Sequence, residues 1–243
     1  TTDNFQIFFD QNLKKDDFVL NFSVDVSSLS LIEYCGRKDI FYLDAGIKPW
    51  SRDNDNSPTA PDQRSNYRLR EDLLSFRKDS HTGRTAVITQ GTTPGLASTL
   101  VKKALDNMAI DCELEFKTPV CNDDWAQLAH ALEIKVIHIA ERDTQTTNAR
   151  KKRNEFVNTW SVDGLITEGL QPAELGWGTH EKHWPTDAER HNNGSYAAIF
   201  LNRPGIATRV HSWTPLEGSY HGFLITHLES ISIANCLTLH AGS

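Results

Sequence analysis

Aromatic rings, carboxylates and glycines are concentrated in one stretch of the sequence, residues 156–184, which we call the aromatic–acidic segment. Its 29 residues include four glycines, three of the chain's six tryptophans (Trp160, Trp177 and Trp184) and four acids: Asp163, Glu168, Glu174 and Glu181. Indole faces attract cations, and nearby carboxylates strengthen that attraction where water is excluded. The composition is typical of a binding site for an amine or polyamine. A second interpretation has equal weight: the segment is an irregular connection whose aromatic rings pack on the domain.

The same segment contains two histidines near an acid, but their spacing does not favour a metal. His180-Glu181-Lys182-His183 is one residue short of the H-E-x-x-H motif, so the two imidazoles would not share one face of a helix. No G-x-S-x-G or P-loop string occurs, so acyl and phosphoryl transfer have no support. We therefore expect no metal site.

The first part of the chain has the pattern of a strand, a helix and a second strand. Residues 18–26 are apolar and rich in β-formers, and a pair of serines then precedes a helical pattern with Glu33 as a capping-box partner. Residues 40–47 are a short apolar run of the kind buried on both faces of a parallel sheet. This βαβ order predicts a Rossmann-like domain.

A glycine-bounded turn, Gly91-Thr92-Thr93-Pro94-Gly95, separates the next strand from the next helix. A polar loop (51–64) and a charged helix (65–79) precede the strand at 85–91, and residues 96–109 follow the turn as a helix. The strand–turn–helix order places Thr92 and Thr93 at the carboxyl edge of the sheet, where open α/β sheets bind ligands. We place the domain boundary here and expect domains at 1–95 and 96–243.

The second half is predicted to combine helices with several strands. Residues 122–134 have a helical pattern, and KVIHIAE (135–141) reads as a strand. The strings YAAIFLNRP, TRVHSWTP and GFLITHLES follow as further strands. The overall prediction is an α/β protein: a partial Rossmann-like domain, then an α+β domain with a mixed sheet that the aromatic–acidic segment crosses as a strand and a helix.

Composition limits the class of protein and its partners. Hydrophobic residues make up 38% and charged residues 23% of the chain, as in a soluble globular protein, and no apolar run is long enough for a membrane span. The four cysteines are far apart, which favours reduced thiols in a cytoplasm. The net charge of −7 argues against a nucleic-acid partner and suits a cationic substrate.

Three long strings resemble the bacterial homospermidine synthase family: FVNTWSVDGLITEGLQPAELGWGTHEKHWP, IHIAERDTQ and GFLITHLESISIA. The resemblance runs from about Asp17 to the C-terminus. That family is NAD-dependent and related in fold to saccharopine dehydrogenases. Its chains are longer and begin with a strand, a G-x-G-x-x-G turn and a helix that hold the dinucleotide, and no such fingerprint occurs here. We therefore expect this sequence to correspond to the middle of a family member.

The resemblance implies a reaction with no net redox change. NAD oxidises the amine carbon of putrescine (or spermidine), a second putrescine attacks the imine, ammonia leaves, and the hydride returns. The product is homospermidine, formed by aminobutyl transfer. The family further implies a homodimer in the cytoplasm, with a diamine or polyamine as its small-molecule partner and with neither nucleic acid nor membrane.

The resemblance also implies roles for particular residues. Glu141 matches a glutamate that contacts the substrate amine, and Trp160 matches a ring that holds the ammonium or iminium by a cation–π contact. The other catalytic candidates are Glu168, His227 and Asp25. Substrate contacts are expected from Thr93, Asp163 and Glu229. Cofactor contacts are expected from Val24, Ser27, Ala45, Gly91 and Pro94.

Two positions depart from the family pattern and leave other functions open. Lys48 replaces a glutamate near the substrate entrance, and Thr93 replaces the asparagine of an N-P-G turn. A cation at Lys48 repels putrescine. A polyamine-binding fragment without catalysis is therefore an alternative, as is a carboxyspermidine-type synthase, which must bind a substrate carboxylate; Lys48 favours the synthase, whereas the retained acids argue against it.

Overall fold

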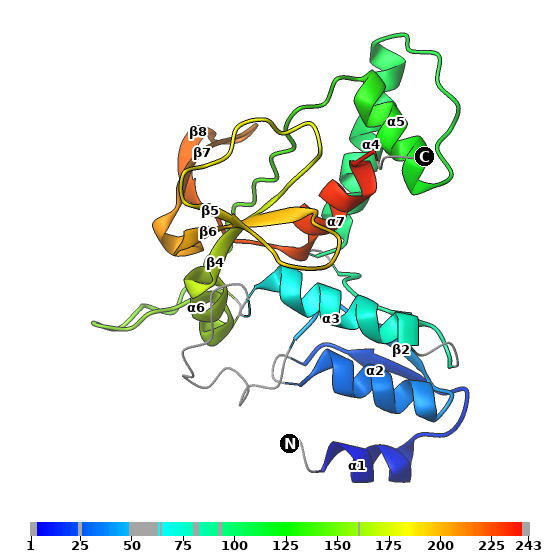
Figure 1. Cartoon of the computed structure of the whole chain (residues 1–243). Coiled ribbons are helices and arrows are strands. Elements are labelled where there is room, and N and C mark those ends of the chain that lie inside the picture. Colours follow the sequence, from blue (N-terminus) through cyan, green and yellow to red (C-terminus); the bar gives the residue numbers. More distant parts are fainter. Residues whose placement is uncertain are drawn as a thin grey trace.

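The computed structural model describes residues 4–23, 26–48, 63, 65–79, 83–91, 94–159 and 161–239. Figure 1 shows the N-terminal elements at one end of the molecule and the C-terminal elements at the other, with helix α3 between them. Four of the predicted positions, Val24, Asp25, Thr93 and Trp160, lie outside the described residues.

The N-terminal half is built on three parallel strands in the order β1-β2-β3, namely Phe18–Asn21, Phe41–Asp44 and Ala86–Val87. Helix α1 (Phe5–Asn12) precedes this sheet, and helix α2 (Ser28–Arg37) connects β1 to β2. The predicted βαβ unit is thus present. Leu31, Tyr34 and Cys35 of α2 pack with Ile40 and Tyr42 as its core.

Helix α2 begins where the serine pair predicts, but its cap is not the expected one. Ser27 is the N-cap residue, and its Oγ accepts a hydrogen bond from the Ser30 N–H at 3.3 Å. A capping box would need an acid at position 30, three residues after the cap, so the expectation for Glu33 was wrong.

Three helices continue the chain in the order that the sequence predicts. Helix α3 spans Asn66–Asp79, α4 spans Leu96–Asp111 and α5 spans Asn122–Ala131. Leu105 and Ala109 of α4 pack against Leu128 and Ala129 of α5 in one cluster. The i, i+4 spacing of Leu105 and Ala109 places both residues on the face of α4 that packs against α5.

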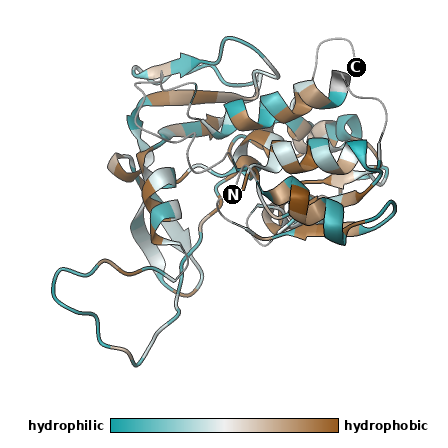
Figure 2. Ribbon diagram, turned by 90° about the horizontal axis from the view of Figure 1, so that it is seen from below, coloured by the Kyte–Doolittle hydropathy of each residue, from teal (hydrophilic) through white to brown (hydrophobic). Residues whose placement is uncertain are grey.

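The chain between α5 and α6 (Val162–Leu170) has no helix or strand, so the strand predicted at 135–141 was wrong. The segment projects from the body in Figure 1, and in Figure 2 the projecting loop is mostly hydrophilic. His138 Nε2 lies 3.4 Å from Ser212 Oγ, and Arg142 pairs with Glu217. These side-chain contacts do not form a backbone ladder, without which an apolar sequence cannot become a strand.

The second half forms two antiparallel sheets. Strands β4 (Pro172–Gly176), β6 (Ala198–Pro204) and β5 (Ala188–Arg190) form the first, in the order β4-β6-β5. A 3₁₀ turn (Gly205–Ala207) leads to the hairpin of β7 (Arg209–Thr214) and β8 (Gly218–Phe223). Helix α7 (Leu228–Leu237) begins inside the string GFLITHLES, which was predicted as strand throughout. The α/β class is confirmed, with the parallel sheet in the first half and antiparallel sheets in the second.

Residues from both halves share two hydrophobic clusters. Ile47 and Leu73 pack with Leu228, and Tyr67 packs with Ala198 and Ile231. The domain boundary at residue 95 stays a prediction. Within the described residues, no helix has both the length and the apolar character needed to cross a membrane.

Candidate active site at the junction of the two halves

The carboxyl end of β2 is held by a buried polar cluster around Asp44. Asp44 Oδ2 accepts hydrogen bonds from Asn21 Nδ2 (2.9 Å), Ser28 Oγ (2.7 Å) and Tyr42 Oη (2.6 Å). Ser28 Oγ in turn accepts the Lys48 N–H at 3.0 Å. The loop after β2, Ala45 to Lys48, is therefore fixed against the first turn of α2.

The glycine-bounded turn lies beside this loop and reaches across to α7. The Leu96 N–H donates to Gly91 O at 3.0 Å, and a Cβ on Gly95 would lie only 2.7 Å from that oxygen. Gly95 also has a φ of +131°, which residues other than glycine rarely adopt. Both the lack of space for a Cβ and the backbone conformation therefore require glycine at this position. The Gly95 N–H donates to Glu229 Oε1 at 3.2 Å, which joins the turn to the opposite half.

His227 and Glu229 lie at the start of α7. His227 is its N-cap residue, and Glu229 lies in the first turn with a side chain only 3% exposed. A carboxylate there is stabilised by the helix dipole. Among the described residues, Glu229 Oε2 is nevertheless buried without a hydrogen-bond partner, and His227 Nδ1 is 3.9 Å away, beyond hydrogen-bonding distance.

Glu168 lies on helix α6. The helix is capped by Ser161, whose Oγ accepts the Gly164 N–H at 3.0 Å. Glu168 Oε2 is buried and forms no hydrogen bond with another residue that the structure describes. Burial raises the pKa of the Glu168 carboxyl, while the positive charges of His227 and Lys48 act in the opposite direction. These interactions show that the loop after β2, helix α6 and the start of α7 converge.

The unbonded carboxylate oxygens at this junction can attract a cation. A buried carboxylate oxygen that lacks a partner costs folding free energy, and an ammonium group would supply both the charge and the hydrogen bonds. Two such oxygens, on Glu168 and Glu229, belong to side chains that approach from different helices. The imidazole of His227, which is one-third exposed, can exchange a proton with a bound amine.

The structure brings some predicted residues together and leaves others apart. Glu168 interacts electrostatically with His227, which lies 3.9 Å from Glu229, and Ser27, Ala45, Gly91 and Pro94 lie along the carboxyl edge of the parallel sheet. Glu141 and Asp163 are exposed, Glu141 in the irregular segment before α6 and Asp163 in the first turn of that helix. The assigned roles stay predictions. The nearness of Lys48 to Glu168 was not predicted, because no local pattern links residues 120 positions apart.

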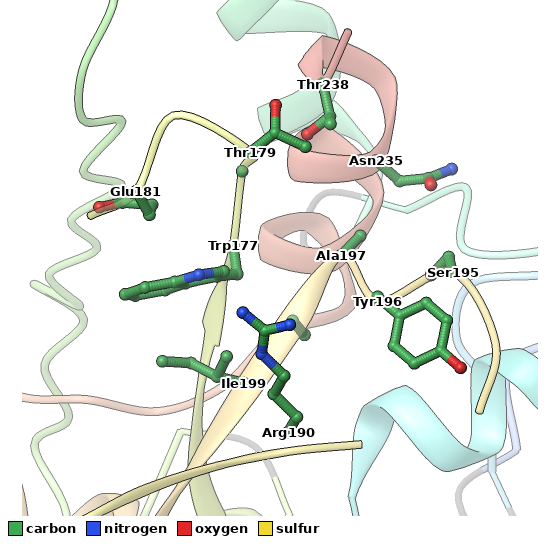
Figure 3. A pocket seen from close by; sticks show the side chains of 12 residues that line it. Trp177, Thr179, Glu181, Arg190, Ser195, Tyr196, Ala197, Ile199, Asn235 and Thr238 are labelled. Carbon is green, nitrogen blue, oxygen red and sulfur yellow. The ribbon is translucent and has the colours of Figure 1, made fainter. Parts of the chain in front are cut away.

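The later residues of the aromatic–acidic segment lie at a different cavity. Trp177 lines a cavity of about 200 Å³ between β6 and α7. Figure 3 shows the Arg190 guanidinium directed between Trp177 and Tyr196. The ring centroids of Trp177 and Trp184 are 5.2 Å apart, and Arg190 lies 4.9 Å over Trp184. An internal cation thus already occupies the face of one of these indoles.

The fold and the acids at the junction are those of a two-part α/β protein, with a parallel sheet of the nucleotide-binding type and an acidic site between its halves. Family models agree. Residues 1–87 match the saccharopine dehydrogenase NADP binding domain, and residues 91–243 match the saccharopine dehydrogenase C-terminal domain. The chain belongs to the saccharopine dehydrogenase family.

Individual relatives are more specific. The chain is 47% identical over 222 residues to a homospermidine synthase of Blastochloris viridis and 46% identical over 226 residues to one of Mesorhizobium japonicum. These alignments cover 91% and 92% of this chain but 46% and 47% of the relatives. The crystal structure of the Legionella pneumophila homospermidine synthase in complex with NAD matches with a TM-score of 0.85 and 46% identity, over 100% of this chain and 50% of that one. The chain thus spans about half the length of these relatives.

Proposed function

We propose that this chain carries the amine site of an NAD-dependent homospermidine synthase, which transfers an aminobutyl group from putrescine, or from spermidine, to a second putrescine. The observation that carries the proposal is the pair of buried carboxylate oxygens without partners, on Glu168 and Glu229, at the junction of the two halves. A diamine would satisfy both. The identity to two homospermidine synthases supports the choice of substrate class.

Glu168 is the proposed proton acceptor. An amine must lose a proton before it can release hydride, because only the neutral amine has the electron pair that expels it. Burial raises the pKa of Glu168, which makes its carboxylate a stronger base than an exposed glutamate. Glu229 holds the amine through its free oxygen, and His227 at the rim of the site relays the proton to solvent.

The carboxyl edge of the parallel sheet fits the nicotinamide end of NAD. Ser27, Ala45, Gly91 and Pro94 surround this edge with small side chains, and the crystal structure of the Legionella pneumophila relative contains NAD. When bound there, NAD takes up a hydride from the amine carbon and returns it. The sequence has no G-x-G-x-x-G turn for the pyrophosphate, so the described residues would hold only part of the cofactor.

A second candidate function is a polyamine-binding chain without catalysis. Putrescine deuterated at its amine carbons distinguishes the two. We expect homospermidine that retains the returned deuteride when the chain is incubated with this substrate and NAD. Putrescine binding without product would favour the second candidate, and no binding at all would contradict both.

Glu168→Gln tests the assignment of the base. We expect kcat to fall by about 100-fold, since removal of a general base costs about 10²- to 10⁴-fold. Glu115→Gln is the matched control, because Glu115 is exposed and lies outside the proposed site. An unchanged kcat in Glu168→Gln would rule out this residue as the proton acceptor.

The proposed enzyme acts as a homodimer in the cytoplasm. Exposed apolar residues in the irregular segment support self-association, with Val136 79% exposed and Phe156 59% exposed. The four cysteines are free, which suits a reducing compartment. Sedimentation velocity tests the dimer: a monomer at micromolar concentration would contradict it.

A further inference from the structure

Two histidines lie directly opposite each other on the hairpin of β7 and β8. The pairing register places His211 of β7 beside His221 of β8. Their ring centroids are 5.3 Å apart, and the ring planes are tilted by 52°. Both side chains are exposed, and within the described residues no hydrogen bond or ion pair engages either imidazole. The ring nitrogens are therefore available to a ligand from solvent.

The hydrogen-bond pattern of the hairpin brings these two side chains close together. The Leu224 N–H donates to Thr208 O at 2.9 Å, so this opposed pair of residues is a hydrogen-bonded one. Bonded and non-bonded pairs alternate along an antiparallel ladder. Counted from that pair toward the turn, His211 and His221 fall on a non-hydrogen-bonded pair. Side chains at such pairs lie closer to each other than those at hydrogen-bonded pairs.

The separation of the two rings suits a metal ion bound between them. A Zn–N bond is about 2.0–2.1 Å long, which puts the centroid of a ligating imidazole about 3.2 Å from the metal. At the tetrahedral angle, two such centroids would be about 5.2 Å apart. The centroids of His211 and His221 are already 5.3 Å apart. Rotation about the last side-chain torsion, which is broad for histidine, can turn a nitrogen of each ring toward a common ion.

The surroundings of the pair supply no third protein ligand. Among the described residues, no group of three or more His, Cys, Asp or Glu side chains is placed to hold a metal ion. His138 lies near β7, but its Nε2 contacts Ser212, which is buried and belongs to the opposite face of the strand from His211. Arg209 shares the face of His211 and opposes a cation, although its guanidinium lies 5.9 Å from the ring centre of Phe223 and salt screens exposed charges. Water would complete the coordination, so the ion should exchange readily.

We propose that His211 and His221 form a two-ligand site for a divalent transition-metal ion such as Zn²⁺, with water in the remaining positions. Neutral imidazole is a good ligand for Zn²⁺ and for the neighbouring metals of the first row. The site goes beyond the proposed amine function, because no residue assigned to the amine takes part in it. The expectation of no metal site was based on the spacing of His180 and His183, whereas strand register brings this second pair together.

Calorimetric titration of the full chain with Zn²⁺, with neither amine nor NAD present, tests the site. Iodoacetamide first blocks the exposed thiols of Cys112 and Cys121, because thiolates also bind Zn²⁺. We expect His211→Asn and His221→Asn each to weaken Zn²⁺ binding by about 100-fold, because two ligands on one scaffold bind far more tightly than either alone. His130→Asn, which removes an exposed histidine at the end of α5, is the matched control and should leave the affinity unchanged. An unchanged affinity in either hairpin variant would overturn the proposal.

Proton NMR of the imidazole rings gives a second readout, made on the original chain. Added Zn²⁺ should shift the ring signals of both His211 and His221 and leave those of His130 in place. Urea denaturation without metal should give the same midpoint for each hairpin variant as for the original chain, because both side chains are exposed. If a variant unfolds more easily, the ring signals of the original chain decide alone. Shifts at one of the two hairpin rings only, or at neither, would contradict a shared ion.

Discussion

Two groups of buried carboxylates in this molecule differ in how completely their oxygens are bonded. Glu174, on β4, has a side chain with no exposed surface, and its oxygens accept the N–H groups of Asn66 (2.9 Å) and Tyr67 (3.3 Å). His191 Nε2 lies 3.2 Å from Glu174 Oε1. Glu229 is also buried and Glu168 is half-buried, yet each keeps one buried oxygen without a hydrogen bond to another described residue.

The difference separates an acid that holds the structure together from acids available to a ligand. We call Tyr67, Glu174 and His191 the junction cluster, since Tyr67 belongs to α3 in the N-terminal half and the other two belong to the C-terminal half. Glu174 caps the first turn of α3, where the helix dipole favours an anion. Its oxygens accept hydrogen bonds within the protein, whereas Glu168 and Glu229 each keep one oxygen without a hydrogen bond to another described residue.

Removal of Glu174 should have the largest effect on stability. Glu174→Ala leaves the N–H groups at the start of α3 without their acceptor and removes the carboxylate that lies 3.2 Å from the buried His191 Nε2. We expect the free energy of unfolding to fall by about 3–5 kcal/mol, measured by urea denaturation. Glu115→Ala should change it by less than about 0.5 kcal/mol. If Glu174→Ala also lowered the free energy of unfolding by less than about 0.5 kcal/mol, the junction cluster would not join the two halves.

Glu229→Gln should affect binding more than folding. Glutamine keeps the acceptor for the Gly95 N–H and removes the negative charge. We expect the Kd for an amine to rise by at least about 30-fold, because the loss of one partner of a buried charge pair costs about 2–5 kcal/mol and each 1.4 kcal/mol is about ten-fold. The urea midpoint should change little. A lower urea midpoint with an unchanged Kd would mean that Glu229, like Glu174, stabilises the fold and does not bind the amine.

The local order of the N-terminal half could be predicted because its signals are local. The apolar run at 18–26, the serines that start α2 and the apolar run at 40–47 each specify one element, and together they give parallel pairing of β1 and β2. The strand expected at 135–141 failed for the opposite reason. Its apolar residues fit a strand, but strand formation depends on a partner that may come from anywhere in the fold, and none of the described strands pairs with it.

What could be predicted about the site also depended on whether the signal in the sequence was local. Glu168, His227 and Glu229 were identified through resemblance to a family, and nothing in their spacing shows that they meet. The aromatic–acidic segment also contained Glu174, and its composition could not tell which of its acids would find internal partners. That distinction depends on α3, which begins 108 positions earlier in the sequence than Glu174.

A smaller effect is expected from the hydroxyl group of Tyr67. It donates to Asn193 O at 2.6 Å and accepts the Tyr196 N–H at 2.8 Å, and the ring stacks on His191 at 3.9 Å. Tyr67→Phe keeps the stacking and removes both hydrogen bonds. We expect a loss of about 1–2 kcal/mol in unfolding free energy, against no measurable loss for Tyr220→Phe. Equal losses in the two variants would show that the hydroxyl does not strengthen the junction.

The smallest effect on stability is expected for Glu168→Gln, and it is opposite in sign to the effect of Glu174→Ala. Because burial raises the pKa of Glu168, the native state binds a proton more tightly than the unfolded chain, whose glutamate titrates near 4.5. The associated stability is fully present below that pH and is lost as the pH rises through the raised pKa. Glutamine cannot ionise, so Glu168→Gln should unfold at a higher temperature than the original chain at pH 8, and the difference should vanish near pH 4. Differential scanning calorimetry at both pH values measures this. A variant less stable at pH 8 would mean that ionised Glu168 is fully paired, as Glu174 is, and that the distinction between the two groups of acids does not hold.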